Sequence, residues 1–405
     1  MKVLVANLGS TSFKYRLFDM TVERQLARGG VERIGSSESR CFVEIGQHRG
    51  ERIQSILNHG AAVDTCIAQL TDPEQGCLLN ASEISAIGFK AVHGGRVSGV
   101  QRIDQDILVA MDEMNSVAPA HNPPYMAAMK QLASMSSKIP LVAAFETDFH
   151  RTIPDAWARY AIPAKIADAL PIRRWGFHGA SHRYIAGRTA ELLGRADARI
   201  LSCHLGGSSS LCAIRNGKSV ATTMGMSPQS GLPQNNRVGD LDPYCLPLIM
   251  QYTGLNLEEV LHMLSTQAGL LGLSDGLSGD VRDLENAADH GNNHARLALE
   301  VYVADIRRQL GGMLIALGGA DAIVFTGGIG ENSFRIRRAV CDQLDDLGIR
   351  LSSPLNASGD AERAIHDASS KIQVWVVPTN EELIVARQTV AAIQSQPSTQ
   401  PSTQP

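Results

Sequence analysis

The chain has 405 residues, of which 44% are hydrophobic and 19% charged, and its formal net charge is −4 at pH 7. That length predicts two domains, because a single hydrophobic core stops growing near about 250 to 300 residues. The slight acidity and the lack of a basic block argue against nucleic acid as a partner. Without an apolar run near ~18 residues or a signal-peptide pattern, we expect no membrane partner and a cytoplasmic location.

The N-terminus carries a β-hairpin pattern. An apolar run at 3–6 is followed by a turn rich in glycine and serine at 7–12 and by a second run at 13–18. A turn without bulky side chains lets backbone N–H groups approach an anion closely. Residues 21–50 continue the alternation and predict further antiparallel strands, and 54–70 has helical spacing.

Two buried strands are predicted next, each ending in polar residues. The run at 84–92 leads into His93-Gly94-Gly95, and the run at 141–145 leads into acidic residues and a histidine at 146–150. In α/β proteins such strand ends hold ligands. A proline-rich loop at 119–124 precedes a helix, and residues 172–182 lead into a helix that ends near Leu193, with Ser181 as its candidate N-cap.

A second hairpin pattern follows roughly two hundred residues after the first. Apolar runs at 200–203 and 211–214 flank His204-Leu205-Gly206-Gly207-Ser208-Ser209-Ser210. Two copies indicate a duplicated architecture with one phosphate-binding hairpin in each half. Ordinary β-hairpins without a ligand remain the alternative interpretation.

The C-terminal half alternates helices and strands. Helical spacing occurs at 244–252, 257–264, 294–317 and 381–393, and strands are expected at 322–325 and 374–377. Residues 278–283 read as a loop, and 327–333 as a glycine-rich anion loop before a helix. The pattern predicts α/β layers, and two phosphate-binding halves predict a kinase-like cleft. The last dozen residues are low in complexity and predicted to be disordered.

The seven cysteines exclude two kinds of site. Their number is odd and they contain no C-x-x-C pair, so neither a disulfide framework nor a zinc site is expected. Cys203, Cys212 and Cys245 lie in apolar surroundings and are predicted to be core thiols.

Phosphoryl transfer requires cations and a metal around the transferred group rather than covalent chemistry. Lys90, His178 and Arg237 stand in turns or at strand ends, where they can meet such a group. Magnesium needs oxygen ligands and keeps several waters, so one amide and one carboxylate are sufficient. Asn7 and Glu381 can supply them.

Eight motifs resemble the acetate kinase family, within the acetate and sugar kinase, Hsc70 and actin superfamily. They are NLGSTSFK at 7–14, HGG at 93–95, PAHNP at 119–123, GFHGASH at 176–182, CHLG at 203–206, NRVGDLDP at 236–243, GGIGEN at 327–332 and TNEEL at 379–383. They occur in family order and cover the chain from residue 3 to about 390.

The resemblance implies an α/β fold of two duplicated ribonuclease H-like domains around a central cleft. The first is an actin-like domain at 1–149, onto which a helix at 380–393 packs back. The second is a nucleotide-binding domain at 150–379, followed by a disordered tail at 394–405.

The resemblance also implies direct, in-line and reversible transfer between ATP and a short-chain carboxylate, giving an acyl phosphate and ADP, in a homodimer that uses Mg²⁺ or Mn²⁺. The implied metal ligands are Asn7 and Glu381. The implied catalytic residues are Lys90, Glu146, His178 and Arg237, supported by His182. The implied substrate pocket comprises Lys90, Val92, Ala120, His121, Phe177 and Pro228. The implied nucleotide and phosphate contacts are Ser10, Ser12, Lys14, His204, Gly206, Gly207, Asp280, Val281, Arg282, Gly328, Ile329, Gly330 and Asn332.

The chain departs from the family pattern at several of these positions. Lys90 replaces an arginine and Glu146 an aspartate, and the shorter and longer reach of the new side chains can preserve an ion pair between them. Gly207 removes an amide near the phosphates, and Leu8 and Val238 replace serines. We expect these changes to affect the phosphoryl path rather than the core.

Ala120 replaces a leucine in the implied acyl pocket, which predicts that propionate or butyrate is used at least as well as acetate. Two alternative functions remain open at this point. The first is a pyrophosphate-dependent kinase on the same scaffold, and the second is a catalytically weak relative that binds nucleotide.

Overall fold

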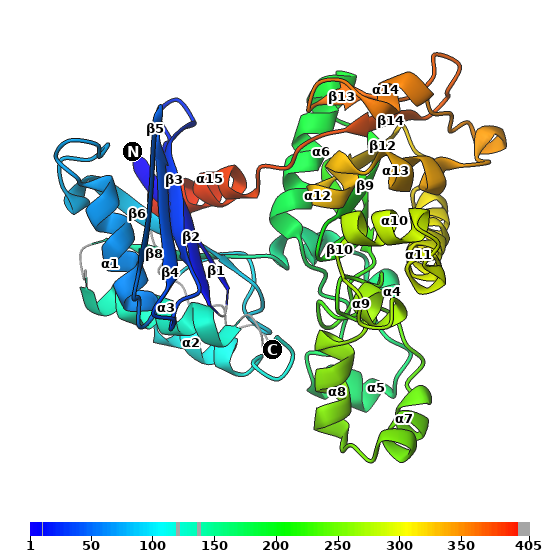
Figure 1. The fold of residues 1–405 in the computed structure, drawn as a ribbon, viewed down its shortest axis with the longest axis horizontal. Helices are drawn as coiled ribbons and strands as arrows, with labels where there is room; N and C mark the ends of the chain where they lie inside the picture. The colour runs from blue at the N-terminus through cyan, green and yellow to red at the C-terminus, as the bar shows by residue number, and fades with distance from the viewer. Residues whose placement is uncertain (10, 119–121, 136–138, 396–405) are drawn as a thin grey trace. The chain divides into compact units, whose positions relative to one another are not determined.

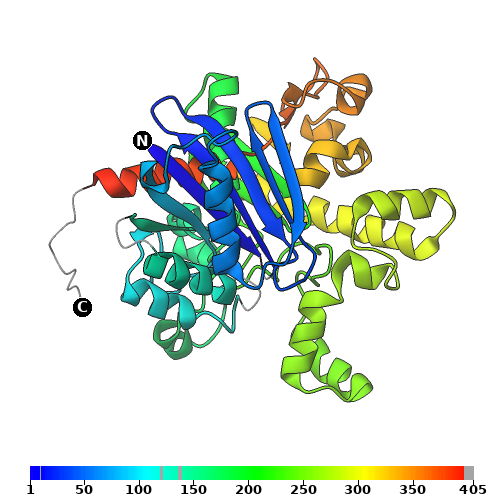
Figure 2. The same ribbon diagram turned by 60° about the vertical axis from the view of Figure 1, so that its left-hand side comes forward.

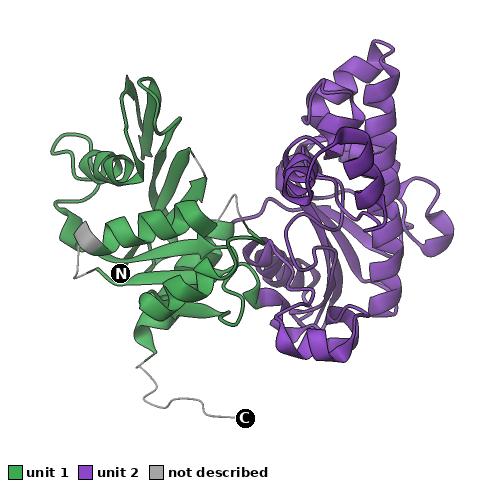
Figure 3. Ribbon diagram, turned by 90° about the horizontal axis from the view of Figure 1, so that it is seen from below, with its two compact units in different colours: residues 1–148, 381–405 green, residues 149–380 purple. Residues whose placement is uncertain are grey.

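The computed structural model describes residues 1–9, 11–118, 122–135 and 139–395. Two compact units divide the chain (Figure 3): residues 1–148 with 381–405 form unit 1, and residues 149–380 form unit 2. Each unit contains one β-sheet with helices packed on it (Figure 1). None of the described helices is long and apolar enough to cross a membrane.

The sheet of unit 1 has the strand order β5-β4-β3-β2-β1-β6-β8-β7. Its strands are β1 (Lys2–Gly9), β2 (Ser12–Asp19), β3 (Arg24–Glu32), β4 (Ser39–Ile45), β5 (His48–Gln54), β6 (Ile84–Ala91), β7 (Val100–Arg102) and β8 (Leu141–Phe145). Strands β1 to β5 form the antiparallel meander that the alternation predicted, whereas β6 and β8 run parallel to β1. The carboxyl ends of β1, β6 and β8 therefore share one edge of the sheet.

Helices cover both faces of this sheet. They are α1 (His59–Leu70), α2 (Gln105–Asp112), α3 (Asn122–Met135) and α15 (Glu381–Gln394). Side chains of α1 and α3 pack with Leu4, Ala6 and Phe89 in one core. Helix α15, red in Figure 2, packs on the opposite face, where a Cβ on Gly88 of β6 would collide with Thr389. The glycine thus permits the close approach of the C-terminal helix.

The sheet of unit 2 has the order β11-β10-β9-β12-β14-β13. Its strands are β9 (Arg199–Leu205), β10 (Ser209–Arg215), β11 (Lys218–Thr222), β12 (Ala322–Thr326), β13 (Arg363–Ala364) and β14 (Gln373–Val376). Strands β9, β10 and β11 form a meander, and β12 and β14 run parallel to β9. Unit 1 repeats this order with β1, β2, β3, β6 and β8, which confirms the predicted duplication of a ribonuclease H-like sheet.

Unit 2 is layered in the same way. Helix α6 (Gly179–Leu193) packs on one face with Ile200, and α11 (Asn293–Leu317) packs on the other with Leu201, as the alternation of a strand requires. The remaining helices are α4 (Asp155–Ala158), α5 (Ala164–Ala169), α7 (Cys245–Thr253), α8 (Leu257–Thr266), α9 (Gly269–Leu273), α10 (Val281–Asp289), α12 (Gly327–Asn332), α13 (Phe334–Cys341) and α14 (Ser353–Ala357). Short 3₁₀ turns occur at Ala81–Glu83, Asp148–Thr152 and Asp345–Leu347.

Several local predictions were wrong. The helix expected from Gln54 starts at His59, because Gln54 ends β5 and Asn58 caps the helix. The loop expected at 278–283 is confirmed only for 278–280, since α10 starts at Val281, and the loop expected at 327–333 is helical from Gly327 to Asn332. Residues 122–124 form the first turn of α3. Proline is tolerated there, because the first N–H groups of a helix have no acceptor within the helix.

Two further residue assignments also differ. Cys203 and Cys212 are buried as predicted, whereas Cys245 begins α7 and is only half-buried. Ser181 does not cap α6, because the helix begins at Gly179 and His178 holds the N-cap position.

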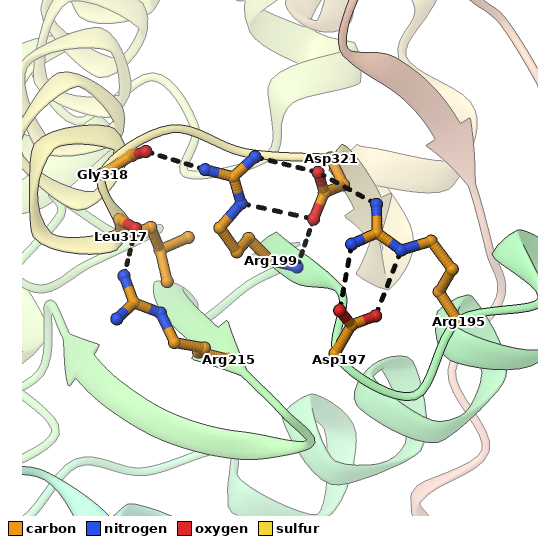
Figure 4. A network of polar contacts seen from close by, with 7 residues as sticks. All are labelled: Arg195, Asp197, Arg199, Arg215, Leu317, Gly318 and Asp321. Atoms are coloured by element: carbon orange, nitrogen blue, oxygen red, sulfur yellow. Dashed lines mark hydrogen bonds and ion pairs between the residues drawn. The ribbon is translucent and has the colours of Figure 1, made fainter.

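An ionic network closes the amino-terminal end of the unit 2 sheet (Figure 4). The Arg199 guanidinium donates to both carboxylate oxygens of Asp321, and Arg195 pairs with Asp197. Arg199 and Arg215 also donate to the carbonyls of Gly318 and Leu317 at the end of α11. Cations at a helix C-terminus satisfy carbonyls that the helix leaves without partners. The charged residues at this end of the sheet therefore stabilise the fold.

Candidate functional site

The polar residues of unit 1 gather at the shared carboxyl edge of β1, β6 and β8. Asn7 lies near the end of β1, Lys90 near the end of β6, and Glu146 directly after β8. Glu381 is the first residue of α15, the helix on the opposite face from α1 and α3. The sequence analysis assigned roles to all four residues, and the fold places each at this edge.

Lys90 forms an ion pair with Glu381, and both side chains are largely buried. Burial by itself would lower the pKa of Lys90, but the charges of Glu381 and Glu146 outweigh it and raise this pKa above its ordinary value. The sequence analysis expected Lys90 to pair with Glu146. In the structure Lys90 pairs with Glu381 instead, because α15 brings this carboxylate to the end of β6. The charge of Glu146 contributes to the raised pKa of Lys90.

Tyr125 of α3 belongs to the same cluster and was missed as a site residue. Its hydroxyl donates to Asn7 Oδ1 at 2.9 Å and accepts from the backbone N–H of Leu8 at 3.1 Å. Burial raises the pKa of Tyr125 to about 12, against the opposing effect of the Lys90 charge. The hydroxyl therefore stays protonated at neutral pH and orients the Asn7 amide.

Leu8 corrects another expectation. We expected its replacement of a serine to affect the phosphoryl path, but its side chain is 5% exposed and packs in the core of unit 1 with Ala6 and Phe13. Leu8 points into the core, on the same face of β1 as Leu4 and Ala6. The substitution is therefore a packing change.

The other predicted residues of unit 1 take varied positions. Lys14 lies on β2, half exposed, and pairs with Glu32 at 2.9 Å. Ser12 begins β2 and is half-buried, and Val92 is 9% exposed beyond the end of β6. Ser10, Ala120 and His121 lie outside the described residues.

Four histidines of unit 2 form a cluster beside the second hairpin. The rings of His178 and His204 stack with centroids 4.2 Å apart, and those of His150 and His182 meet edge to face at 5.7 Å. His178 has a left-handed backbone with φ of 57° at the start of α6. A left-handed conformation is uncommon for a residue with a side chain and is frequent at functional sites.

Serine hydroxyls connect these rings. Ser210 Oγ lies 2.8 Å from His178 Nδ1 and 2.9 Å from His182 Nε2, and Ser202 Oγ lies 2.9 Å from His182 Nδ1. Burial holds the pKa of His182 well below its ordinary value, so this ring is neutral. Ser181, expected as a helix cap, instead bonds His204 Nδ1 at 2.8 Å.

His150 completes the cluster, although the sequence analysis gave it no role. Its Nε2–H donates to the carbonyl of Phe177 at 2.9 Å, and its Nδ1 lies 2.9 Å from the hydroxyl of Ser219. Burial lowers the pKa of His150 to about 4. The ring therefore fixes the segment before His178, and Phe177 itself is buried at 2% exposure.

Arg237 stands among neutral partners. Its Nη1 donates to Gln234 Oε1 at 3.1 Å and to Ser208 Oγ at 3.4 Å, and burial lowers its pKa below the usual value. Among the ion pairs within the described ranges, none involves Arg237. The amide of Gln234 is in turn anchored on the carbonyl of the buried Pro228 at 2.8 Å. Val238, which follows Arg237, donates its backbone N–H to Leu264.

The glycine-rich segments of unit 2 lie side by side. A Cβ built on Gly206 would lie 3.8 Å from the backbone N of Gly328, so the β9–β10 turn adjoins α12. Gly327 has φ of 76°, and a Cβ there would lie 2.7 Å from the Leu205 carbonyl oxygen, so only glycine fits. The structure thus brings together the hairpin and the loop that the sequence analysis treated separately.

A buried arginine, also missed from sequence, supports α12. Arg337 is 1% exposed and donates to the carbonyls of Gly330 and Glu331 and to both oxygens of Asn356. Its pKa is lowered by burial to about 10. These four bonds fix the C-terminal end of the short helix that carries Gly328, Ile329 and Asn332.

The implied adenine residues form the start of α10. The Asp280 carboxylate caps this helix by accepting from the Arg282 backbone N–H at 2.9 Å, and it also accepts from the Arg282 guanidinium. Ser333 Oγ donates to Glu285 at 2.6 Å, which joins α10 to the start of α13. A cavity of about 580 Å³ between α10, α11 and α13 is lined by Leu299, Val303 and Ile336 among others, but by none of the predicted nucleotide residues.

The donor set of unit 1 fits a hard divalent cation. Asn7, Glu146 and Glu381 offer an amide and two carboxylates, and Lys90 lies beside these carboxylates. Within the described residues no group of three His, Cys, Asp or Glu side chains could hold a metal by itself. Mg²⁺ commonly uses one or two carboxylates together with waters and substrate phosphates, so these residues are chemically suited to it.

Comparison with known proteins gave consistent matches over nearly the whole chain. The acetokinase family profile matches residues 2–387. An acetate kinase of Pseudothermotoga lettingae is 40% identical over 398 residues, which cover 98% of this chain and 98% of that protein. An acetate kinase of Methanosarcina barkeri is 40% identical over 402 residues, again 98% of each chain.

Two solved structures are similar in fold and in sequence. An acetate kinase of Porphyromonas gingivalis has a TM-score of 0.88 and 36% identity, covering 97% of this chain and 100% of the other. A propionate kinase of Francisella tularensis has a TM-score of 0.90 and 31% identity, covering 96% and 99%.

Proposed function

The chain belongs to the acetokinase family, and from this we propose that it catalyses the ATP-dependent phosphorylation of a short-chain carboxylate. A carboxylate oxygen forms a bond to the γ-phosphorus of ATP while the bond from that phosphorus to the bridging oxygen breaks. The products are an acyl phosphate and ADP, and the reaction is reversible. The family match across residues 2–387 is the observation that carries this proposal.

In unit 2, Arg237 and His178 stabilise the charge of the transferring phosphoryl group. Support comes from the half-buried guanidinium of Arg237, whose neutral partners leave its positive charge for an anion. The neutral His182 orients Ser210, and Ser210 orients His178. The residues that line the phosphates are His204, Gly206, Gly207, Gly328, Ile329, Gly330 and Asn332. The adenine is flanked by Asp280, Val281 and Arg282.

In unit 1, Asn7 and Glu381 hold Mg²⁺ or Mn²⁺, which when bound neutralises negative charge on the phosphate oxygens. Tyr125 keeps the Asn7 amide oriented, as its hydrogen bond to Oδ1 indicates. Lys90 contacts the carboxylate substrate, and Lys90 and Glu146 are the catalytic residues that unit 1 contributes to phosphoryl transfer. Ser10, Ser12 and Lys14 contribute to the phosphate track, and His121 supports the site.

Acetate, propionate and butyrate are the proposed acids. The residues assigned to the alkyl end by the family resemblance are Val92, Ala120, Phe177 and Pro228, and the small side chain of Ala120 favours an acid longer than acetate. The similarity to a propionate kinase supports this range. We place the reaction in the cytoplasm, where ATP is supplied.

A homodimer is proposed on the basis of an apolar surface on the helices α7 and α8. Tyr244, Leu248, Tyr252, Leu257 and Leu261 are all exposed there, Tyr252 to 92%. Exposed apolar patches of this kind mark protein interfaces. Sedimentation analysis of the protein and of Tyr252→Glu tests this, and a monomeric parent protein would contradict it.

A coupled assay tests the activity. The protein is given ATP, Mg²⁺ and each acid, and ADP release is compared with the acyl phosphate trapped by hydroxylamine. Equal amounts of both products are expected. Product formation from pyrophosphate but not from ATP would instead support a pyrophosphate-dependent kinase, and nucleotide binding without product would indicate a weak relative. The family match favours neither alternative.

A further inference from the structure

A side-chain amide from a separate loop lies beside the turn between β9 and β10. Gly207 of this turn has no side chain, whereas the family pattern has an amide at this position near the phosphates. A Cβ built on Gly207 would lie 3.3 Å from Asn235 Nδ2 and 3.7 Å from Asn235 Cγ. The Asn235 amide therefore lies close to where a side chain on Gly207 would start.

The backbone of Asn235 is held on both sides. Its N–H donates to the Gly207 carbonyl at 3.2 Å, and its own carbonyl accepts from the Leu271 N–H at 2.8 Å. A Cβ on Gly279 would lie 2.6 Å from that same carbonyl oxygen, so the segment before Asp280 packs directly against Asn235. A side chain on such a fixed backbone loses little freedom when it binds a ligand.

The amide itself has no protein partner within the described parts of the chain. Asn235 Oδ1 is buried and makes no hydrogen bond there, and Nδ2, the donor atom of the amide and the one nearest to Gly207, makes none with the described residues either. Buried polar groups without partners are rare in native proteins, and each requires an explanation. Close by, Ser208 Oγ donates to Gln234 and accepts from Arg237, so the same pair of loops also presents a hydroxyl and a guanidinium.

We propose that Asn235 positions the nucleotide by donating a hydrogen bond from its amide to a phosphate oxygen beyond the α-phosphate. The amide missing at position 207 is thereby supplied by the loop that also carries Arg237. This inference rests on the proposed function, because it takes ATP and ADP as the ligands. It adds a polyphosphate contact from a residue that the sequence analysis did not select.

Calorimetric titration of the full chain with ADP and with adenosine tests the proposal. Asn235→Ala should weaken ADP binding about tenfold, the effect of losing one hydrogen bond to a charged group, and leave adenosine binding unchanged. Asn293→Ala, an exposed asparagine at the start of α11, is the matched control and should change neither. The thermal midpoint of Asn235→Ala should not fall, because the lost amide has no protein partner.

An exchange of the two side chains provides a second measurement. Gly207 does not have a positive φ, so an asparagine fits its backbone, but Gly207→Asn alone would crowd the Asn235 amide. Gly207→Asn combined with Asn235→Gly removes that conflict and should restore ADP affinity to within about threefold of the parent. Failure of Asn235→Ala to weaken ADP, an equal loss for adenosine, or a parent that does not bind ADP would overturn the inference. A parent that binds ADP through Asn235 but forms no acyl phosphate would refute only the proposed function.

Discussion

The ammonium of Lys90, in β6, forms an ion pair with the carboxylate of Glu381, the first residue of α15. The pair joins the C-terminal helix to the central sheet of unit 1 at the edge where Asn7 and Glu146 also lie. Glu381 is also the proposed carboxylate ligand of the metal. Lys90 and a divalent cation therefore compete for one carboxylate, and the protein supplies its own cation when the metal is absent.

Lys90→Met should make the protein less stable and more responsive to Mg²⁺. The variant removes the Lys90 charge from the largely buried Glu381 carboxylate, which costs roughly 3 kcal/mol of unfolding free energy. Mg²⁺ can replace the lost charge, so adding it should raise the melting temperature of Lys90→Met by several degrees more than that of the parent. Differential scanning fluorimetry with and without MgCl₂ measures both effects.

The matched control is Lys2→Met. Lys2 pairs with Glu83 in the same unit, with both side chains about a quarter to a third exposed (27% and 30%). This variant should lose little stability and should respond to Mg²⁺ as the parent does. An equal Mg²⁺ response in the parent, Lys2→Met and Lys90→Met would show that Lys90 and the metal do not share Glu381.

Arg237→Ala should lower kcat by about 10³-fold or more and change the KM for ATP much less, because a cation that stabilises transition-state charge acts mainly on the chemical step. Arg237→Lys should recover part of the loss, since it restores the charge without the planar fork. Steady-state kinetics with ATP and propionate measure both variants. A variant that keeps more than about a tenth of the parent kcat contradicts the assigned role.

Acid should destabilise the protein through the buried His150. The folded state holds the pKa of His150 at about 4, and the ordinary value is 6.5, so the unfolded chain binds a proton over this range. The stability that neutral His150 contributes is fully present above about pH 6.5 and is lost as the pH falls toward 4, to a total of ~3 kcal/mol.

Urea denaturation at several pH values between 4 and 7 checks this. His150→Gln should reduce the slope of unfolding free energy against pH, and the slope should not vanish because burial also lowers the pKa of His182. His262→Gln, at an exposed position on α8, serves as the control and should leave the slope unchanged. If both variants retain the parent slope, His150 does not contribute to acid sensitivity.

The sequence predicted strands and helices correctly where the periodicity of apolar residues is visible within a short segment. The alternation at 3–18 and 200–214 predicted both hairpins, and their likeness predicted the duplicated sheets. The pairing of Lys90 with Glu381 was not predictable, because the two residues are 291 positions apart and meet only after α15 packs on the sheet. Tyr125 was missed for the same reason, since a tyrosine in a helix reads as core until its hydroxyl is located.

Loop predictions failed where a short helix replaced the expected turn. Glycines normally weaken a helix, so the run at 327–330 favoured a loop. In the structure Arg337 fixes the end of α12 from a later helix, and this tertiary contact outweighs local propensity. The burial of Leu8 similarly depends on which face of β1 meets the core, a choice that a motif comparison does not reveal.

Ala120→Leu should shift acid preference toward acetate. Ala120 lies outside the described residues, so this prediction depends on the sequence motif alone. Removing three carbons from the pocket wall gives longer acids room, and each buried CH₂ contributes ~0.8 kcal/mol. We expect kcat/KM for propionate or butyrate to equal or exceed that for acetate in the parent. A parent that prefers acetate about tenfold, with no change in Ala120→Leu, would contradict the pocket assignment.

Tyr125→Phe isolates one hydroxyl of the proposed metal site and has a matched control in the same unit. The Tyr125 hydroxyl bonds both Asn7 and Leu8, whereas the equally buried Tyr15 hydroxyl has no hydrogen-bond partner in the described structure. Tyr125→Phe strands a buried N–H and should cost ~1 to 3 kcal/mol of unfolding free energy, while Tyr15→Phe should be neutral or stabilising. Only Tyr125→Phe should also raise the Mg²⁺ concentration for half-maximal activity, because the Asn7 amide loses its orientation. If both variants lose equal stability and keep the parent Mg²⁺ requirement, the hydroxyl of Tyr125 does not organise the site.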